Sequence, residues 1–243
     1  MHKADHVYTR RFFYLFHALI LMIILYPLVE TRQDQQVPWV LILANTVIIL
    51  TVIWTSCFKL HEFILGVCIG LPSILIYWFP WVPYADETLL LSRGLLFLYT
   101  IKMIFPHLMR ANEIGPDEVF ATTSIYILLG MTWTVIYEAI EHYVPGSFYL
   151  STDLDRVLNW SDIVYFSFTT LTTLGYGDIT PVNPFARSIA ILEAITGILF
   201  IPVIVSGAMS LFLSSSWNKR HVEEVTAVVE KKILKDVNKQ KKK

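Results

Sequence analysis

The chain has 243 residues, of which 55% are hydrophobic and 16% are charged, and its net charge is −1. Soluble globular domains carry about 25% charged residues, so this composition excludes an ordinary soluble protein and predicts a membrane protein. The sequence holds no Walker, zinc or nucleophile motif. We therefore expect neither enzymatic activity nor a nucleic-acid partner.

Six stretches are apolar over roughly the 20 residues that a membrane-spanning helix needs. They are Phe12–Val29, Pro38–Phe58, Phe63–Val82, Thr88–Met109, Val119–Ile140 and Ala186–Leu213. The apolar run Ile163–Leu171 is too short to span and is predicted to be a re-entrant helix, with Asn159 or Ser161 as its N-cap. The predicted fold class is an all-α membrane protein with six transmembrane helices and one re-entrant helix.

Basic residues are distributed unevenly between the two ends of these helices. One side holds Lys3, Arg10, Arg11, Lys59, Arg110 and the tail from Lys219 onward, and the other holds Arg32, Arg156 and Arg187. The positive-inside rule then places both termini in the cytoplasm of a multi-pass protein of the cell membrane. The first apolar run lacks a signal-peptide cleavage site. Cys57 and Cys68 fit no metal spacing and are expected to be buried as small apolar side chains.

The chain divides into four predicted parts. They are a cytoplasmic N-terminus (1–11), a four-helix membrane unit (12–110), a second membrane unit (111–216) and a basic cytoplasmic tail helix (217–243). The link Arg110–Gly115 is short and Pro116 suits the first turn of a helix, so we expect the two membrane units of one chain to pack side by side. The tail fits either a coiled coil or a membrane-surface helix, and we expect no nucleotide-binding domain.

The run Thr169–Asp178, which reads TTLTTLGYGD, does not suit regular structure. Gly175 and Gly177 flank one tyrosine, and glycine adopts backbone conformations that are closed to other residues. Alternation of such conformations can turn successive carbonyl oxygens toward one axis, where four copies would replace the water shell of a K⁺ ion. The predicted filter is Thr173, Leu174, Gly175, Tyr176 and Gly177, with K⁺ bound at the first four.

The region from about Trp160 to Leu213 resembles the potassium channel superfamily, whose filters read TVGYG, and its wording looks like the pore of small prokaryotic channels. The first 110 residues resemble this family only in hydropathy and helix count. The resemblance implies a homotetramer in a lipid bilayer that conducts K⁺ passively, because one chain supplies a quarter of each carbonyl ring. Residues 111–216 would then be the pore domain, and residues 12–110 a degenerate voltage-sensor-like domain.

Other functions stay open at this point. A K⁺ transporter subunit would carry four half-filters in one chain, and a non-selective channel would depart from tyrosine at Tyr176. A voltage-gated K⁺ channel with an atypical sensor and a sensor protein with a vestigial pore are further alternatives.

Four residues are expected to support the filter, namely Asp178, Thr169, Glu138 and Glu193. The resemblance implies that Glu138 ties the fifth helix to the loop after the filter; the alternative is a solvated glutamate at the membrane interface. Glu193 is costly inside a membrane if it is unpaired, so it is expected to lie behind the filter against hydroxyl groups of the re-entrant helix or against Arg187.

The last predicted span contains a candidate hinge and a candidate gate. Gly197 lies 20 residues after Gly177, where the resemblance implies a gating hinge, although glycine also serves close packing. Pro202 removes a backbone hydrogen bond and predicts a kink. One helix face is assigned to the cavity and gate, with packing on the fifth helix as the alternative; it carries Ile198, Ile201, Val205 and Met209.

The fourth span carries Arg93 and Lys102, nine residues apart, with Leu96 and Tyr99 between them. At about 100° per residue these two basic groups lie on opposite faces of an α-helix. We therefore predict at most weak voltage dependence, with Arg93 reaching outward and Lys102 inward to their own interfaces.

Overall fold

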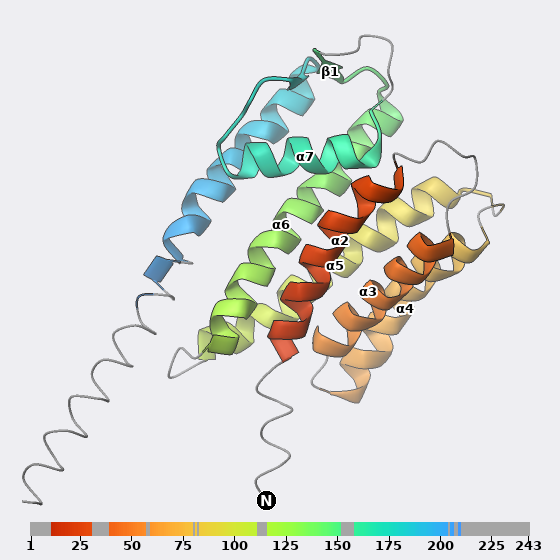
Figure 1. Cartoon of the computed structure of the whole chain (residues 1–243), viewed down its shortest axis with the longest axis vertical. Coiled ribbons are helices and arrows are strands. Elements are labelled where there is room, and N and C mark those ends of the chain that lie inside the picture. The colour runs from red at the N-terminus through yellow and green to blue at the C-terminus, as the bar shows by residue number, and fades with distance from the viewer. Residues whose placement is uncertain are drawn as a thin grey trace, which may run out of the picture.

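The computed structural model describes residues 11–56, 59–79, 81, 83–110, 116–151, 158–203, 205, 206 and 209. In this part of the chain the long helices come first, and a short helix between two short strands precedes the last long helix (Figure 1). The elements are α2 (Arg11–Glu30), α3 (Trp39–Ser56), α4 (Leu60–Trp78), α5 (Ala85–Arg110), α6 (Pro116–Tyr143), β1 (Phe148–Leu150), α7 (Trp160–Leu171), β2 (Ile179–Pro181) and the last helix, Pro184–Val203.

Four of the described helices are long and apolar enough to cross a membrane. These are Leu60–Trp78, Ala85–Pro106, Pro116–Tyr143 and Pro184–Val203, while α2 and α3 contain the shorter apolar stretches Arg11–Leu25 and Asn45–Thr55. The fold is therefore mostly helical and has the helices of a multi-pass membrane protein. The basic tail (217–243), the link after Arg110 and Cys57 lie outside the described residues.

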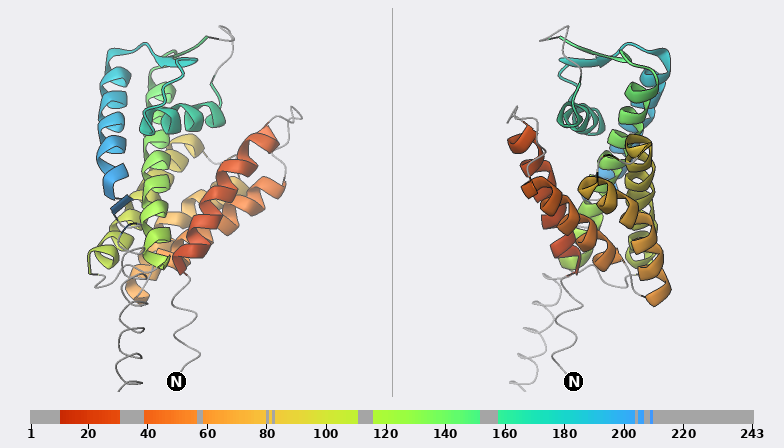
Figure 2. Two further views of the ribbon diagram at one scale, coloured as in Figure 1. Left: turned by 60° about the vertical axis from the view of Figure 1, so that its left-hand side comes forward. Right: turned by 90° about the vertical axis from the view of Figure 1, so that its right-hand side faces the viewer.

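The start of the short helix α7 is set by its own sequence. Asn159 is the N-cap, as predicted: its side chain accepts a hydrogen bond from the Asp162 backbone N–H at 2.9 Å. The Asp162 carboxylate accepts from the Asn159 backbone N–H at 3.0 Å, which completes a capping box. The helix ends at Leu171 as predicted, and Figure 2 shows α7 lying across α6.

A two-stranded antiparallel sheet departs from the predicted all-α class. Phe148 pairs with Pro181, and Leu150 pairs with Ile179. This two-stranded sheet joins the segment before α7 to the segment after the predicted filter. Strands of three residues are too short to give a periodic sequence signal, which is why the sequence did not reveal them.

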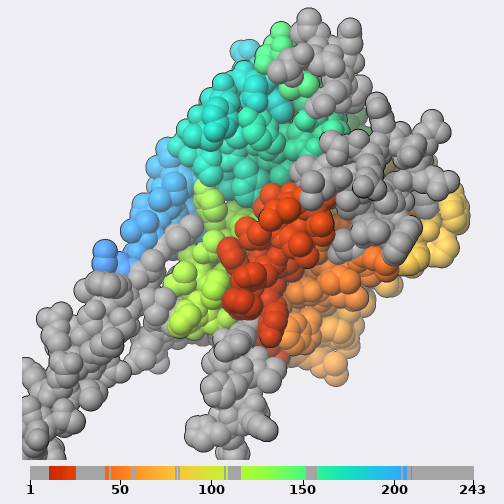
Figure 3. Space-filling model, viewed as in Figure 1, coloured from red at the N-terminus to blue at the C-terminus, as the bar shows by residue number. Residues whose placement is uncertain are grey.

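One apolar core joins the two predicted membrane units. Its buried members include Leu15 on α2, Val52 on α3, Leu96 on α5, Leu128 on α6 and Val164 on α7. Both α2 and α5 pack on α6 of the same chain, and the space-filling view shows α2 against α6 below the α7 region (Figure 3). The four-helix unit is thus attached to the following helices by buried side chains.

Small residues allow close helix contacts within this arrangement. A Cβ added to Gly70 would lie 2.9 Å from the Ile53 side chain, so glycine brings α4 against α3. Cys68 on the same helix is exposed within the chain, which corrects the expectation that it is buried. The cysteine lies on a face of α4 that contacts no other described helix closely enough to cover it.

Candidate functional site

The predicted filter segment, Thr173–Gly177, has an alternating backbone. The φ angles of Thr173, Gly175 and Gly177 are +60°, +52° and +80°, whereas the residues between them are not in this region. Two of these positions are glycines, as the sequence analysis required, but Thr173 adopts a left-handed conformation that nothing in its sequence context indicated. This alternation is the conformation that turns successive carbonyl groups toward the same side.

The C-terminal turn of α7 holds the start of this segment. The Thr169 carbonyl oxygen accepts hydrogen bonds from the backbone N–H groups of Leu174 at 2.8 Å and Gly175 at 3.1 Å. The Thr173 N–H donates to the Thr170 carbonyl at 2.9 Å. Thr169, which was predicted to support the filter, therefore contacts it through its main chain, and the side chains of Leu174 and Tyr176 are exposed in the single chain.

Behind the filter segment, an aromatic pair and a carboxylate form an outer brace. The hydroxyl group of Tyr165 on α7 donates to Asp178 Oδ2 at 2.7 Å. The rings of Tyr165 and Tyr176 are parallel, with centroids 6.4 Å apart and planes within 2°. Asp178 also accepts from the Ile179 N–H through Oδ1 at 3.0 Å and from the Ser151 N–H through its carbonyl at 2.8 Å. Asp178 thus connects the filter segment to α7 and to the two-stranded sheet. Its partner Tyr165 was not predicted from the sequence.

A second polar group lies on the inner side, where three helices meet. Glu193 on the last helix is completely buried. Its Oε1 accepts from Ser167 Oγ at 2.6 Å, and its Oε2 accepts from the Tyr137 hydroxyl at 2.5 Å. Ser167 belongs to α7, so the expectation of a hydroxyl partner from the re-entrant helix is met, whereas Arg187 instead donates to the Pro181 carbonyl at 2.9 Å. This carboxylate network joins α6, α7 and the last helix.

The Tyr137 side chain is itself fixed by aromatic neighbours. Its ring makes edge contacts with Phe148 of β1 at 5.5 Å and with Phe166 of α7 at 5.0 Å between centroids. Such edge-to-face pairs are a preferred arrangement of buried aromatic rings. The sequence does contain a signal for this role: a tyrosine within an apolar span, at least one helical turn away from the polar end of that span.

Two glycines let α7 lie close to its neighbours. A Cβ on Gly130 of α6 would lie 2.8 Å from the Phe168 ring, and the Gly130 carbonyl oxygen lies 2.8 Å from Ser167 Oγ, the hydroxyl group that also contacts Glu193. A Cβ on Gly197 of the last helix would collide with the backbone carbonyl of Leu171. Gly197 therefore has a packing requirement at the end of α7, in addition to the hinge role that the resemblance implied.

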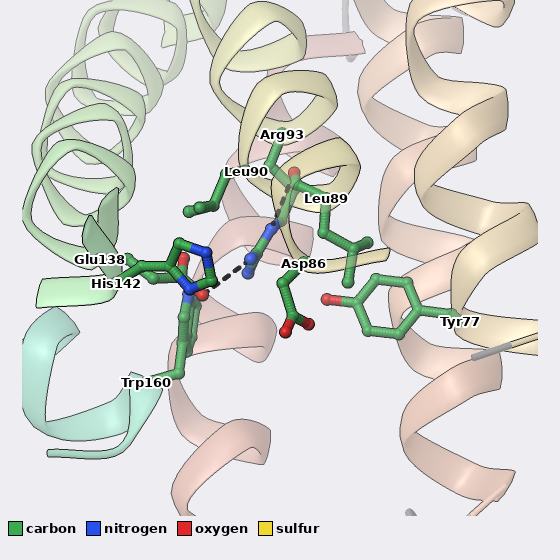
Figure 4. Close-up of a pocket in the computed structure, with 8 residues that line it drawn as sticks. All are labelled: Tyr77, Asp86, Leu89, Leu90, Arg93, Glu138, His142 and Trp160. Atoms are coloured by element: carbon green, nitrogen blue, oxygen red, sulfur yellow. Dashed lines mark hydrogen bonds and ion pairs between the residues drawn. The ribbon is translucent and has the colours of Figure 1, made fainter. Parts of the chain in front are cut away.

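The structure pairs Glu138 with an arginine of α5 instead of the loop after the filter. Its Oε1 accepts a hydrogen bond from Arg93 Nη2 at 2.9 Å, so the pair connects α6 to α5 (Figure 4). Arg93 is buried, with 8% exposure, which corrects the expectation that its side chain reaches outward to the membrane interface. Lys102 is exposed within the chain. A charged group buried among helices is retained because a carboxylate compensates it.

Glu141, three residues after Glu138, is bonded to the chain that follows α6. Glu141 accepts from the backbone N–H groups of Gly146 at 2.8 Å and Ser147 at 3.0 Å. The Ser147 carbonyl in turn accepts from the Val182 N–H at 2.9 Å in the loop after the filter segment. Glu141 therefore connects the end of α6 to the segment before β1, and among the described residues Glu138 does not form the connection to the loop after the filter that the resemblance implied.

The face assigned to the cavity and gate is uncovered in the single chain. Its members Ile198, Ile201, Val205 and Met209 are between 41% and 57% exposed. The neighbouring Phe200 instead stacks on Tyr126 of α6, with centroids 5.7 Å apart. The alternative that this face packs on α6 is therefore not what the structure shows. Pro202 lies near the end of the described helix and is also exposed.

This region of the chain is similar to known proteins. A family model described as "Ion channel" matches residues 139–214, which include α7, the filter segment and the last helix. "Two pore potassium channel c" of Oryza sativa subsp. japonica is 35% identical over 88 residues, which is 36% of this chain and 17% of that protein.

Two bacterial proteins are also similar. "Inward rectifier potassium channel Kirbac3.1" of Paramagnetospirillum magnetotacticum is 32% identical over 95 residues, 37% of this chain and 28% of the relative. "Voltage-gated potassium channel Kch" of Escherichia coli (strain K12) is 25% identical over 145 residues, 59% of this chain and 31% of the relative. The matched part of the chain therefore spans between 17% and 31% of the lengths of these three relatives.

Proposed function

We propose that this chain, which is similar to potassium channels over its pore region, is one subunit of a homotetrameric K⁺-selective channel. The family match and the relatives indicate an ion channel and not an enzyme. The observation that carries the proposal is the alternation of positive φ at Thr173, Gly175 and Gly177 directly after a capped short helix. In the proposed channel, K⁺ ions lose their water to carbonyl oxygens of Thr173–Gly177 from four chains.

The exposed surfaces of the single chain support a fourfold assembly. The side chains of Leu174 and Tyr176 in the filter segment are 57% and 68% exposed in the single chain. Their carbonyl groups are among those that would bind ions. The cavity face of the last helix is likewise uncovered. We propose that neighbouring copies and the central pore account for these surfaces, because one filter segment supplies only a quarter of a closed ring.

The proposed gate is the narrowing of four last helices at their cytoplasmic ends. Four copies of Ile201, Val205 and Met209 would form apolar rings, and such rings block ions by excluding water. Replacing Val205 with aspartate is then expected to raise open probability or conductance. The proposed orientation places both termini in the cytoplasm and the two-stranded sheet on the outer side of the cell membrane.

The proposed channel has weak voltage dependence. A steep response needs about 3–4 charges per subunit to move through the membrane field. Arg93 is paired with Glu138 on α6. Of the other basic residues of α5, Lys102 is the one whose side chain the structure describes. Two basic groups on opposite faces, one of them paired to the pore unit, support a static role for α5.

Tracer flux into liposomes tests the proposed function. Liposomes containing the purified chain should accumulate rubidium, which substitutes for K⁺, against an outward K⁺ gradient, and barium should stop the uptake. Matched liposomes with the Gly175→Ala chain should insert equal protein and accumulate no tracer. Equal uptake of sodium and rubidium tracers by the native chain would reject K⁺ selectivity.

A further inference from the structure

A cavity of about 310 Å³ lies between the four-helix unit and the second membrane unit, and no step of ion conduction uses it. Its walls come from α4, α5, α6 and the first residue of α7 (Figure 4). Cavities of about 300–1,000 Å³ with apolar walls and a few polar groups are typical of small-molecule sites. This one has two leucine side chains, Leu89 and Leu90, and two aromatic rings, Tyr77 and Trp160.

The polar groups of the cavity favour a cation. Two carboxylates, Asp86 and Glu138, line it beside one guanidinium, Arg93. The guanidinium is already paired with Glu138 Oε1, while the buried Oε2 of Glu138 accepts no hydrogen bond from any residue that the structure describes. Asp86 is exposed and makes no ion pair among the described residues. His142 also lines the cavity, and its ring nitrogen lies 3.7 Å from Glu87.

We propose that this cavity binds a small molecule with a protonated amine and an apolar body. The ammonium group donates to Asp86 and lies beside the Arg93–Glu138 pair. The apolar body lies between the leucines and the aromatic rings. The faces of these rings also attract the ammonium group. The shared chemistry is that of a free arylalkylamine or the amine of a lipid headgroup, and the test below separates these two sources.

The position of the cavity gives the ligand a route to the filter segment. Tyr77 and Asp86 belong to the four-helix unit, whereas Glu138 and Trp160 belong to the second unit, so one ligand contacts both. Trp160 is the first residue of α7, whose last turn holds the filter segment. Binding therefore shifts channel opening; this consequence rests on the proposed function.

Calorimetric titration of the full-length chain in lipid nanodiscs tests the site directly. The probe is 2-phenylethylamine, with 2-phenylethanol as the uncharged analogue of nearly equal shape. The amine is expected to bind saturably, and the alcohol about tenfold more weakly, because hydrogen bonds to charged groups carry most of the affinity. Asp86→Asn should weaken amine binding about tenfold. Glu118→Gln, which changes an acid in the first turn of α6 at the opposite end of that helix from Glu138 and His142, should leave it within about twofold.

The outcomes separate this inference from the proposed function. Absence of amine binding, equal binding of the alcohol, or unchanged binding to Asp86→Asn would overturn the site, whether or not the chain conducts K⁺. Nanodiscs of phosphatidylethanolamine against phosphatidylcholine distinguish the sources: competition of the first lipid with the probe assigns the site to a lipid amine. In bilayer recordings, the amine should change open probability in the native channel and not in Asp86→Asn. A voltage-dependent block that persists in Asp86→Asn would place the amine in the pore and overturn the regulatory role.

Discussion

The carboxylate of Glu193 lies 2.5 Å from the hydroxyl oxygen of Tyr137, a residue 56 positions earlier in the chain, and both side chains are completely buried. With Ser167 on the other oxygen at 2.6 Å, this carboxylate connects the last helix to α6 and α7. A buried acidic group is stable in such a place only when its oxygens accept hydrogen bonds. Helix α7, whose last turn holds the filter segment, is therefore attached to α6 and to the last helix through the buried carboxylate of Glu193.

We predict that removal of one hydroxyl partner of Glu193 destabilises the protein. Tyr137→Phe leaves an oxygen of the carboxylate without its donor, which costs about 1–3 kcal/mol in the free energy of unfolding. Denaturation of the purified protein by detergent titration measures this change. Tyr149→Phe removes the hydroxyl group of an exposed tyrosine in β1 and serves as the control. Equal stability of the Tyr137 and Tyr149 variants would count against the network.

Gly197→Ala is predicted to disrupt packing and not only gating. The new Cβ would collide with the Leu171 main chain, which cannot move as a side chain can, so we expect destabilisation above about 3 kcal/mol. Gly94→Ala is the matched helix control, since its Cβ would lie 3.3 Å from a valine methyl group and the change should stay within about 1 kcal/mol. A stable Gly197→Ala protein with altered opening would show that the glycine acts as a hinge alone.

The outer brace is predicted to control how long the filter segment conducts. Tyr165→Phe keeps the ring beside Tyr176 but removes the hydrogen bond to Asp178, so the segment loses one attachment to α7. Hydrogen bonds to charged groups contribute about 1.5–3 kcal/mol. We expect currents that decay faster than those of the native channel during sustained K⁺ conduction. A native time course in Tyr165→Phe, in recordings with the same K⁺ concentrations, would reject this role.

The pair Arg93–Glu138 is predicted to hold α5 against α6. A double-mutant cycle with Arg93→Gln and Glu138→Gln should give a coupling energy above the 0.2–1 kcal/mol typical of exposed ion pairs, because Arg93 is buried. The conductance–voltage curve should be shallow in the native channel and stay shallow in Arg93→Gln. Lys102→Gln, at an exposed position, is the control. A steep native curve that flattens in Arg93→Gln would make α5 a voltage sensor.

The sequence predicted those features that depend on neighbouring residues. The start of α7 follows from a capping box within four residues, and the positive φ angles at Gly175 and Gly177 follow from the two glycines around Tyr176. The buried environment of Glu193 was predictable in kind, because a carboxylate in an apolar helix requires hydroxyl or basic partners. In each case the physical requirement can be read within one segment.

Features that depend on how helices pack were not predictable in this way. Arg93 is paired with Glu138, 45 positions later, because α5 and α6 lie side by side along their lengths. An isolated helix with one arginine near its end is equally compatible with a side chain that reaches the membrane surface. The same limit explains why the partner of Glu138 was not predicted, since Arg93 and the loop after the filter both lie far from Glu138 in the sequence.

The reversal potential under bi-ionic conditions, with K⁺ on one side of a planar bilayer and an equal concentration of Na⁺ on the other, tests the central claim most directly. The filter conformation at Gly175 and Gly177 predicts reversal far from zero, toward the K⁺ equilibrium potential. Gly175→Ala, whose φ of +52° costs a non-glycine residue about 1–2 kcal/mol, is predicted to abolish the K⁺ current while the protein still inserts. A reversal potential near zero in the native protein would contradict K⁺ selectivity.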